Sequence, residues 1–419
     1  MSFKKISVIG LGYIGLPTAA MFASKSQKVI GVDIDSNIVD TINRGDIHIV
    51  EPGLEDMVRS AVKSNFLIAS TVPEKADAFL IAVPTPFKQS NDYYPTPDLT
   101  YVKSAIDSIS GVLKSGDIII LESTSPIGTT EKISQWLSKA RPDLIFPNLN
   151  DDNCDVNIAY CPERVLPGNI IDELVQNDRI IGGLTESCSN KALSLYKLFV
   201  EGECIQTNSR TAEMAKLTEN SSRDVQIAFA NELSMICDKS GIDVWELISL
   251  TNRHPRVNIL QPGPGVGGHC IAVDPWFIVN ENPKDSKLIK MAREVNDAKP
   301  KWVLEKTKEK IKLFKESNKD NNLDNVIIAC YGLSFKANID DLRESPALQI
   351  TKQIKELKLG KVIAVEPNIS NLDCADIDLV SMDYALANAN IHLVLVDHEQ
   401  FKLRVNLDKN FIIDTKGIW

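Results

Sequence analysis

Residues 5–15 read KISVIGLGYIG, and this stretch decides the fold. The β-rich run KISVIG ends in Gly10, and Gly12 and Gly15 complete the spacing GxGxxG before the helix-like residues 16–25. The first glycine allows a tight turn, the second lets the backbone approach a pyrophosphate, and the third permits close packing of helix on strand. Because the N-terminus of that helix would face the phosphates, the stretch predicts a dinucleotide-binding strand, turn and helix.

An acidic residue stands where the ribose of such a cofactor is expected. Asp33 ends the second β-rich run, KVIGVD, about 20 residues beyond the glycines. Its carboxylate can bond the ribose 2′-OH and would repel a 2′-phosphate, and no arginine follows it immediately, so NAD is favoured over NADP. The motifs VPTP, with Thr85, and ESTSPIGTT, with Thr124, follow later apolar runs, where doubly wound folds place their ligand crevice. The cofactor-binding positions predicted from these motifs are Gly10, Gly12, Tyr13, Ile14, Gly15, Asp33, Thr85 and Thr124.

Strand-like and helix-like segments alternate in the first third of the chain and again near its C-terminus. The β-rich runs are KISVIG, KVIGVD, AFLIAVP and DIIILES in the first part, and NVIIACYG, KVIAVEP, IHLVLVDH and FIIDTKG in the second. Such alternation predicts parallel sheets covered by helices. Between them, residues 209–249 have helical character, and a second helix-like stretch over residues 286–315 is expected to break at Pro300. The predicted fold class is α/β, with two doubly wound (Rossmann-like) domains joined by a long central helical segment.

A chain of 419 residues suggests two or three domains, at roughly 100–200 residues each. We place an N-terminal NAD-binding domain at residues 1–205, a central helical domain at residues 206–318 and a C-terminal Rossmann-like domain at residues 319–419. The polar segment KESNKDNNLDN reads as the linker into the last of these.

The composition excludes several classes of protein. Hydrophobic residues make up 43% of the chain, which excludes a disordered or fibrous protein. The formal net charge of −10, with both signs interspersed, makes nucleic acid and anionic membranes poor partners, so any polyanion needs a local basic pocket. We find no signal peptide and no run of ~18 apolar residues that a membrane span needs. The eight cysteines show no CxxC or zinc-ligand spacing, so we expect reduced thiols in the cytoplasm and no metal site.

One cysteine differs from the others in its surroundings. The segment GPGVGGHCIAVDP holds Cys270 directly after a very glycine-rich loop, with Asp274 four residues beyond. Such a loop lets backbone amides approach a ligand closely, which a buried structural cysteine would not need. Cys270 is therefore the candidate for covalent catalysis.

Polar and basic groups elsewhere could complete such a site. Lys216, Asn220 and Arg223 are spaced i, i+4 and i+7 and so line one face of a helix, although most such stripes are simply solvated. The segment YCPERVLPG places Glu163 and Arg164 in a proline-bracketed loop. In NRHPRVN a basic cluster could hold a diphosphate; it comprises Arg253, His254 and Arg256.

With these residues in hand, the chain resembles the UDP-glucose/GDP-mannose dehydrogenase family over essentially its whole length. The shared motifs, in order, are GLGYIG, VPTP, STSPIGTT, CPERVLPG, the helix with Lys216 and Asn220, GVGGHCIAVD and FKANIDDLRESP. Within the family, EPGL, NRHPRVNILQPGPGVGGHC and the terminal DTKGIW are most similar to the members that oxidise UDP-N-acetyl-D-mannosamine for enterobacterial surface polysaccharide, such as enterobacterial common antigen.

The resemblance implies a four-electron oxidation of a sugar C6 alcohol to a carboxylate with two NAD. Cys270 would hold the aldehyde as a thiohemiacetal, which a second oxidation turns into a thioester for hydrolysis. Lys216 and Asn220 would stabilise the oxyanion, and Lys216 could exchange the hydroxyl proton. Asp274 matches the aspartate that orders the catalytic water, and Glu163 the glutamate assigned to acid–base work. Which carboxylate activates the water stays open.

The same resemblance implies binding residues and an assembly. The substrate-binding positions, besides Lys216 and Asn220, are Arg164, Val165, Arg223, His254, Arg256, Gly267, Lys336 and Lys416. Arg343 would contact the cofactor, and residues 319–419 would bind the UDP-sugar. A homodimer is implied, with the long central helix at its interface and a basic residue near Arg256 reaching the neighbouring subunit.

Other functions stay open at this point. A two-electron β-hydroxyacid-type NAD dehydrogenase would share the N-terminal fold and a catalytic lysine but would not need Cys270. A different UDP-sugar, such as UDP-N-acetyl-D-glucosamine, could be the substrate, because no physical argument chooses the epimer at C2. An NAD-sensing binding protein would explain the glycine turn and Asp33 alone. The yield of NADH per sugar separates the first of these from a four-electron enzyme.

Overall fold

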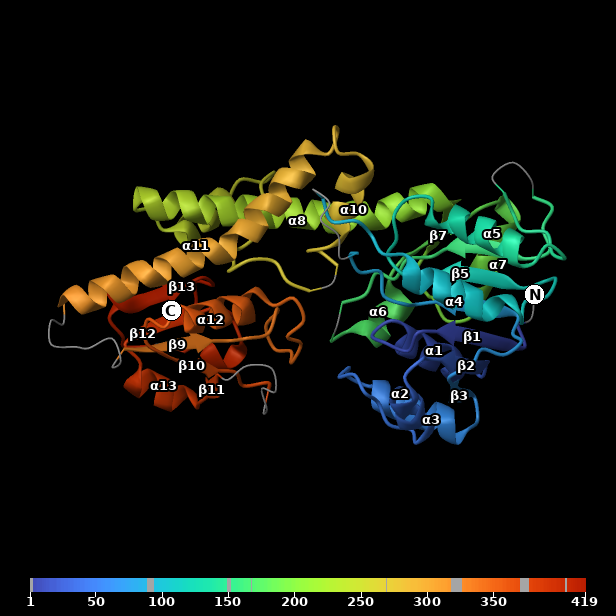
Figure 1. Ribbon diagram of the computed structural model, residues 1–419, viewed down its shortest axis with the longest axis horizontal. Coiled ribbons are helices and arrows are strands. Elements are labelled where there is room, and N and C mark those ends of the chain that lie inside the picture. The colour runs from blue at the N-terminus through green and yellow to red at the C-terminus, as the bar shows by residue number, and fades with distance from the viewer. Residues whose placement is uncertain are drawn as a thin grey trace. The chain divides into compact units, whose positions relative to one another are not determined.

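The computed structural model describes residues 3–88, 94–148, 152–166, 168–268, 270–317, 326–369, 377–403 and 405–419. Most of the predicted linker KESNKDNNLDN and one residue of the GGHC motif, His269, lie outside these ranges. The chain divides into two compact units, Met1–Glu219 and Asn220–Trp419 (Figure 1). The predicted division into three domains at residues 205 and 318 is a different partition and stays a prediction.

The first unit contains an eight-stranded sheet, counted over the described residues, in the order β3-β2-β1-β4-β5-β6-β7-β8. All neighbours run parallel except β6 and β7, which are antiparallel. The strands are β1 Lys5–Ile9, β2 Lys28–Val32, β3 Leu67–Ser70, β4 Ala78–Ile81, β5 Ile118–Leu121, β6 Asn157–Tyr160, β7 Arg179–Gly183 and β8 Cys204–Asn208. The helices are α1 Gly15–Ser24, α2 Ser36–Asn43, α3 Leu54–Lys63, α4 Thr100–Ser110, α5 Thr129–Ala140, α6 Ile170–Gln176 and α7 Glu186–Tyr196.

The central strands of this sheet are buried on both faces. All four residues of β4 and of β5 are buried, which explains why they read as continuous apolar runs rather than alternating ones. Successive side chains still point to opposite faces, so Leu80 packs into one core cluster and Phe79 and Ile81 into another. The four runs predicted in this region correspond to β1, β2, β4 and β5, and the doubly wound fold is confirmed.

A long helix, α8 Ser209–Ser240, begins in the first unit and continues into the second. The second unit adds α9 Val244–Thr251, α10 Asp274–Glu281, α11 Lys287–Ser317, α12 Pro346–Glu356 and α13 Met382–Asn388. Its described residues form a five-stranded parallel sheet in the order β11-β10-β9-β12-β13. These strands are β9 Ile327–Tyr331, β10 Lys361–Val365, β11 Asp378–Leu379, β12 Ile391–Val394 and β13 Ile412–Asp414.

The predicted break at Pro300 is wrong, because α11 is one helix with Pro300 inside it. A proline in a helix interior costs about 3 kcal/mol through its missing N–H and its ring. Buried contacts on both sides of the proline offset this cost. Before it, the Arg293 guanidinium bonds the Asp224 carboxylate at 2.5 Å, and after it Val303 is fully buried in the core. Tertiary packing therefore overrides the local preference.

The two sheets repeat one hydrogen-bond pattern at the ends of their first strands. After β1, the Leu11 amide donates to the Asp33 carboxylate at 2.9 Å; after β9, the Leu333 amide donates to the Glu366 carboxylate at 2.7 Å. The residue before each leucine is a glycine with a positive φ, 91° and 90°. The second half is therefore built like the first around its initial strand, as the alternation of segments predicts.

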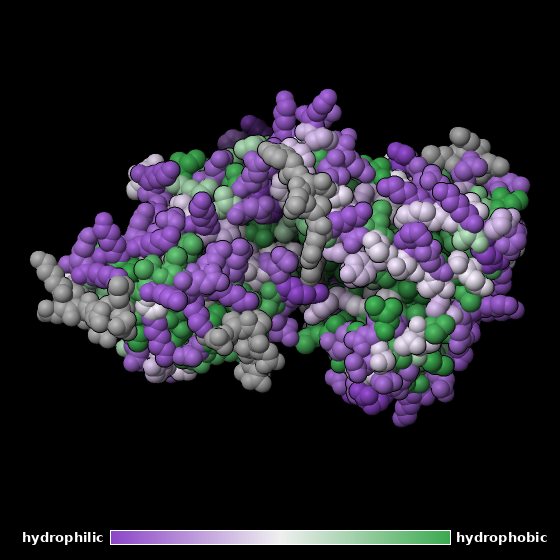
Figure 2. Space-filling model, in the orientation of Figure 1, coloured by the Kyte–Doolittle hydropathy of each residue, from purple (hydrophilic) through white to green (hydrophobic). Residues whose placement is uncertain are grey.

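The visible surface is mainly hydrophilic (Figure 2). Figure 2 shows hydrophilic residues (purple) spread over the visible face of both units, with smaller hydrophobic areas between them. Among the described helices, none combines the length and the apolar character that crossing a membrane requires.

Candidate functional site

The turn after β1 has the shape that a dinucleotide needs. Gly10 has a φ of 91°, and a Cβ there would lie 2.6 Å from the Ala82 oxygen. A Cβ at Gly15 would lie 1.8 Å from the Gly10 oxygen, so neither position accepts another residue. At Gly12, by contrast, a Cβ would meet no described atom within 4 Å, so the outer side of the turn is open. The N-cap of α1 is Ile14, whose side chain has no acceptor. In the first turn, the Leu16 amide donates to the Gly12 oxygen at 3.1 Å and Pro17 has no N–H, so the Gly15 amide is the one that can bind phosphate.

The acidic residue lies directly beside this turn. Asp33 follows β2, and one carboxylate oxygen accepts from the Leu11 amide at 2.9 Å while the other accepts from the Asp35 amide at 3.0 Å. Two contacts fix the carboxylate at the end of the strand, where a ribose would lie. The hydroxyl of Thr85 donates to the Thr124 oxygen at 2.6 Å, so the loops after β4 and β5 are joined at the same sheet edge. The residues of this edge fit NAD.

The catalytic lysine predicted on α8 reaches the loop that holds the predicted glutamate. The Nζ of Lys216 donates to the main-chain oxygen of Glu163. The carboxylate of Glu163 points elsewhere: it is 7% exposed and accepts from the Arg179 guanidinium at 2.6 Å and from the Arg164 amide at 2.7 Å. The structure therefore joins Lys216 to Glu163 through the backbone, while the side chain faces a buried arginine.

A buried charged cluster surrounds this glutamate. Arg179 also lies 3.6 Å from Glu122, which accepts a 2.6 Å bond from the Tyr196 hydroxyl. Burial raises the pKa of Glu122 to about 7, although the positive charge of Arg179 opposes that shift. Sequence reasoning missed Arg179 and Glu122. The only available signals were charged residues at the two ends of apolar runs, DRIIGG and DIIILES.

The predicted nucleophile and its carboxylate are neighbours in the second unit. The Asp274 amide donates to the Cys270 oxygen at 2.8 Å, which closes a tight turn at the start of α10. Cys270 is exposed, and Asp274 is 2% exposed. The side-chain amide of Asn220 on α8 donates to the Asp274 carboxylate. The structure thus brings Asn220 together with Cys270 and Asp274. Asn220 and Asp274 lie 54 residues apart along the chain.

The glycine loop before Cys270 packs closely on the segment FKANIDDLRESP. A Cβ at Gly267 would lie 2.5 Å from the Glu344 oxygen and 2.9 Å from Phe335, so only glycine fits. At the other end of the loop, a Cβ at Gly263 would lie 3.8 Å from the Nζ of Lys416. Of the predicted substrate positions, Gly267 therefore belongs to this loop and Lys416 lies beside it. A third position, Lys336, directly follows Phe335, which packs on the loop.

The remaining predicted positions are more scattered. Arg223 is exposed on α8, and His254 and Arg256 are exposed in the turn after α9, where the Arg256 amide donates to His254 Nδ1 at 3.3 Å. Val165 packs against the core of the first unit. Arg343 belongs to the second unit and pairs with Asp341 at 2.6 Å. The site roles of all these residues stay predictions.

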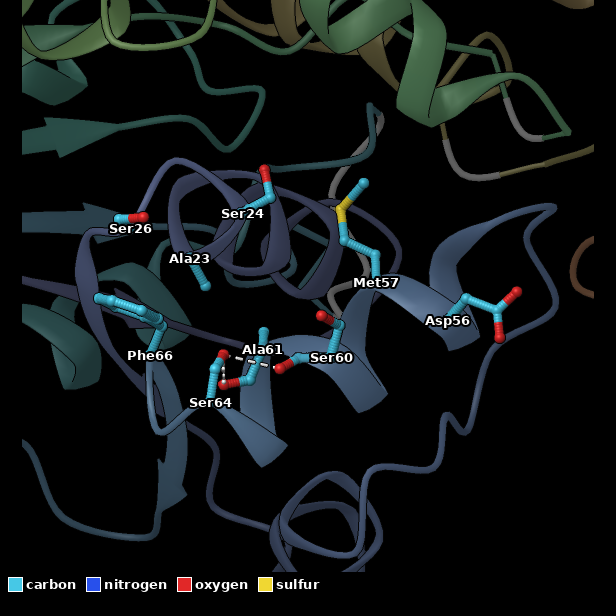
Figure 3. Close-up of a pocket in the computed structure, with 9 residues that line it drawn as sticks. All are labelled: Ala23, Ser24, Ser26, Asp56, Met57, Ser60, Ala61, Ser64 and Phe66. Atoms are coloured by element: carbon cyan, nitrogen blue, oxygen red, sulfur yellow. Dashed lines mark hydrogen bonds between the residues drawn. The ribbon is translucent and has the colours of Figure 1, made fainter.

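A pocket of about 460 Å³ lies in the first unit between the end of α1 and one side of α3 (Figure 3). Serine side chains from both helices line it together with Met57 and Phe66. The Ser64 hydroxyl in its wall donates to the Ser60 oxygen at 2.7 Å. None of the predicted site residues lines this pocket.

Comparisons with known proteins cover the whole chain. Residues 4–200, 210–298 and 329–419 match the models of the NAD binding, central and UDP binding domains of the UDP-glucose/GDP-mannose dehydrogenase family. A UDP-N-acetyl-D-mannosamine dehydrogenase of Escherichia coli K12 is 59% identical over 427 residues, covering 100% of both chains. An NDP-N-acetyl-D-galactosaminuronic acid dehydrogenase of Ralstonia nicotianae is 58% identical and covers 100% of this chain and 97% of its own.

Solved structures give the same picture. A UDP-N-acetyl-mannosamine dehydrogenase from Staphylococcus aureus has a TM-score of 0.84 at 43% identity, covering 99% of this chain and 95% of the other. A UDP-D-ManNAc dehydrogenase from Pyrococcus horikoshii has a TM-score of 0.87 at 36% identity, covering 99% and 96%.

Proposed function

Because the chain belongs to the UDP-glucose/GDP-mannose dehydrogenase family, we propose that it oxidises the C6 alcohol of UDP-N-acetyl-D-mannosamine to the carboxylate with NAD. The relative from E. coli, at 59% identity over its full length, supports this sugar. The observation that carries the chemistry is the hydrogen bond from Asn220 on α8 to Asp274, which closes the turn that begins at Cys270.

The residues that would hold NAD are those of the edge at β1 and β2. Gly10, Gly12 and the first turn of α1 would receive the pyrophosphate, and Asp33 the ribose. When bound there, NAD accepts a hydride in each of the two oxidations. The carboxylate of Asp33 disfavours NADP because it would repel the 2′-phosphate on the ribose.

Lys216 and Asn220 act on the oxygen at C6. They project from consecutive turns of one helix, four residues apart, so both can face the same group. Lys216 takes up the proton of the hydroxyl in the first oxidation, and both side chains then donate to the oxygen as it gains negative charge. The main-chain oxygen of Glu163 accepts a hydrogen bond from the Lys216 amino group and so holds that group in a fixed place.

Cys270 keeps the substrate bound between the two oxidations. Its thiolate adds to the aldehyde carbon to form a thiohemiacetal, which still carries the hydrogen that the second oxidation removes. The product is a thioester, and water cleaves its C–S bond to release the carboxylate and restore the thiol. Cys270 is an exposed residue, so a sugar can reach it.

Asp274 is the carboxylate that we assign to the hydrolytic water. It is tied to Cys270 through the backbone and to Asn220 through its side chain, so it is fixed beside the thioester. The acid–base role that the family resemblance gives to Glu163 stays a prediction, because its carboxylate is held by Arg179 and the Arg164 amide.

We further propose a cytoplasmic homodimer whose product enters surface polysaccharide such as enterobacterial common antigen. The exposed Phe229 and Ile236, 51% and 53% accessible and seven residues apart on α8, support packing along that helix. A catalytic thiol such as Cys270 needs a reducing compartment, which supports the cytoplasm.

The relative from Ralstonia favours a second candidate, the oxidation of a nucleotide of N-acetyl-D-galactosamine, because its identity of 58% is nearly equal. Rates of NADH formation with a panel of UDP-sugars decide between the two. We expect the highest kcat/KM with UDP-N-acetyl-D-mannosamine. A higher value with the galactosamine or glucosamine nucleotide would replace the proposed substrate.

A further inference from the structure

We propose that Asn177, the C-cap of α6, and Arg179, the first residue of β7, are positioning residues for the reaction: they hold Glu163 and Arg164 so that Glu163 presents its carbonyl to Lys216. This inference rests on the proposed function, in which Lys216 acts at C6. Neither Arg179 nor Asn177 belongs to any motif that the sequence singles out.

Arg179 fixes the side chain of Glu163. One guanidinium nitrogen donates to Glu163 Oε2 at 2.6 Å, and the other carboxylate oxygen accepts from the Arg164 amide at 2.7 Å. Both groups are nearly buried, with Arg179 4% and Glu163 7% exposed. A charge-assisted bond in such surroundings holds its partner firmly. The Glu163 residue therefore has little freedom to turn.

Asn177 and Asp178 fix the next residue in the same way. The side-chain amide of Asn177 donates to the Arg164 oxygen at 3.0 Å. The Arg164 guanidinium donates back to the main-chain oxygen of Asp178 at 3.0 Å. Residues 177–179 are thus hydrogen-bonded to two consecutive residues of the loop after β6, Glu163 and Arg164.

The loop held in this way meets α8 twice. The Glu163 oxygen accepts from Lys216 Nζ, and the Arg164 guanidinium pairs with the Glu219 carboxylate at 2.8 Å. Lys216 and Glu219 are three residues apart, hence on neighbouring positions of one helix face. A shift of the loop would therefore move the acceptor away from the Lys216 ammonium.

Arginine suits this task better than lysine. The Arg179 guanidinium stacks on the Tyr196 ring with 4.3 Å between its carbon and the ring centroid, and it lies 3.6 Å from Glu122. A planar fork can stack and bond a carboxylate at once, whereas an ammonium is a point charge. Arg179→Lys keeps the charge but loses the fixed direction, which makes it the informative variant.

The first measurement is kinetic. For Arg179→Lys in the full-length enzyme we expect kcat to fall about 10- to 100-fold, as for a misplaced catalytic group, while the affinity for NAD and the melting temperature stay near wild type. The matched control is Arg141→Lys in the same unit, whose guanidinium bonds Asp143 and the Ser110 oxygen but not this loop. The control should keep the wild-type kcat.

The second measurement needs no turnover. Trace acetylation with acetic anhydride, followed by peptide mass spectrometry, reports the reactivity of the Lys216 amine. In Arg179→Lys the Lys216 amine should lose its hydrogen bond to the Glu163 carbonyl, and its rate of acetylation should rise about fivefold, which corresponds to the free energy of one hydrogen bond. In Arg141→Lys the rate of acetylation should be unchanged. If the wild-type enzyme oxidises no nucleotide sugar, the proposed function fails, yet this labelling still decides whether Arg179 positions Lys216.

Two further variants test the proposal even if Arg179→Lys folds poorly. Asn177→Ala removes only the bond to the Arg164 oxygen and should shift Lys216 reactivity and kcat in the same direction, by less. Combining Arg179→Lys with Glu163→Gln should cost no more kcat than the larger single effect, because Arg179 acts through Glu163. Wild-type Lys216 reactivity in folded Arg179→Lys and Asn177→Ala, or fully additive losses in the double variant, would overturn the proposal.

Discussion

The side-chain amide of Asn220 donates a hydrogen bond to the carboxylate of Asp274. Asp274 is 2% exposed, and its amide bonds the Cys270 oxygen at 2.8 Å, so one contact links α8 to the turn that carries the thiol. A carboxylate held in this way can orient water at a thioester, which is the role that we propose for it.

Asp274→Asn should therefore slow hydrolysis more than oxidation. We expect a burst of NADH, about two per active site, followed by turnover about 100-fold below wild type, because the thioester forms but water is not activated. Rapid-quench kinetics and intact-protein mass spectrometry would detect the covalent sugar on Cys270. The control is Asp285→Asn, which changes an exposed carboxylate beyond the end of α10. If the variant showed no burst of NADH and no covalent sugar on Cys270, Asp274 would have no role in the hydrolysis.

Cys270→Ala should abolish uronate formation while NAD still binds. Cys270 is exposed after a glycine-rich loop of the second unit, whereas the glycine turn and Asp33, which we propose to hold the pyrophosphate and ribose of NAD, belong to the first unit. Product analysis by mass spectrometry and NAD titration by fluorescence check the two halves of this prediction. Cys204→Ala, at a half-buried thiol of β8, should behave as wild type. Normal uronate yield from the Cys270 variant would exclude covalent catalysis.

Asp33→Asn should weaken NAD binding about tenfold and relax the discrimination against NADP. The ribose loses a charged acceptor, whose hydrogen bond is worth about 1.5–3 kcal/mol, and the repulsion of a 2′-phosphate disappears. Kd values for both cofactors, measured by calorimetry, give the ratio. Asp46→Asn, at an exposed carboxylate after α2, serves as the control. An unchanged NAD-to-NADP ratio would show that Asp33 only braces the Leu11 turn.

Lys299→Met should make the protein more stable at neutral pH. Burial lowers the pKa of the Lys299 amine to about 7, against the attraction of Asp238, and its Nζ contacts the Ser234 hydroxyl inside the second unit. An unfolded lysine keeps its proton up to its ordinary pKa of 10.5. Between these two values the unfolded chain binds a proton that the folded chain does not, so the stability of the wild type rises with pH, at most about 1.4 kcal/mol for each pH unit.

The methionine variant has no such proton. The difference in melting temperature between variant and wild type should therefore be largest near pH 7 and shrink as the pH rises toward 10. Calorimetric scans across that range measure it. A constant difference would mean that Lys299 has the same pKa in the folded and the unfolded protein.

What the sequence predicts well is local in the chain. The GxGxxG turn and the acid after the second strand each span a few residues or follow a fixed spacing. One strand escaped detection because it lacks an apolar run: β8, CIQTN, is mostly exposed at the edge of its sheet. The helix through Pro300 escaped because contacts with α8 decide it.

The parts of the site that sequence reasoning missed are non-local. Arg179 meets Glu163 across 16 residues, and Lys216 meets it across 53. Neither separation follows a helical or strand period, so no pattern in the sequence could pair them. The contacts of the Glu163 carboxylate with Arg179 and the Arg164 amide are likewise visible only in the packed structure.

The most direct test of the four-electron oxidation is the yield of NADH. Purified wild-type enzyme is given a limiting, known amount of UDP-N-acetyl-D-mannosamine and excess NAD, and the reaction runs to completion. Because Cys270 holds the aldehyde for a second oxidation, we predict two NADH and one uronate for each sugar consumed. One NADH for each sugar, with free aldehyde as the product, would contradict the proposed chemistry.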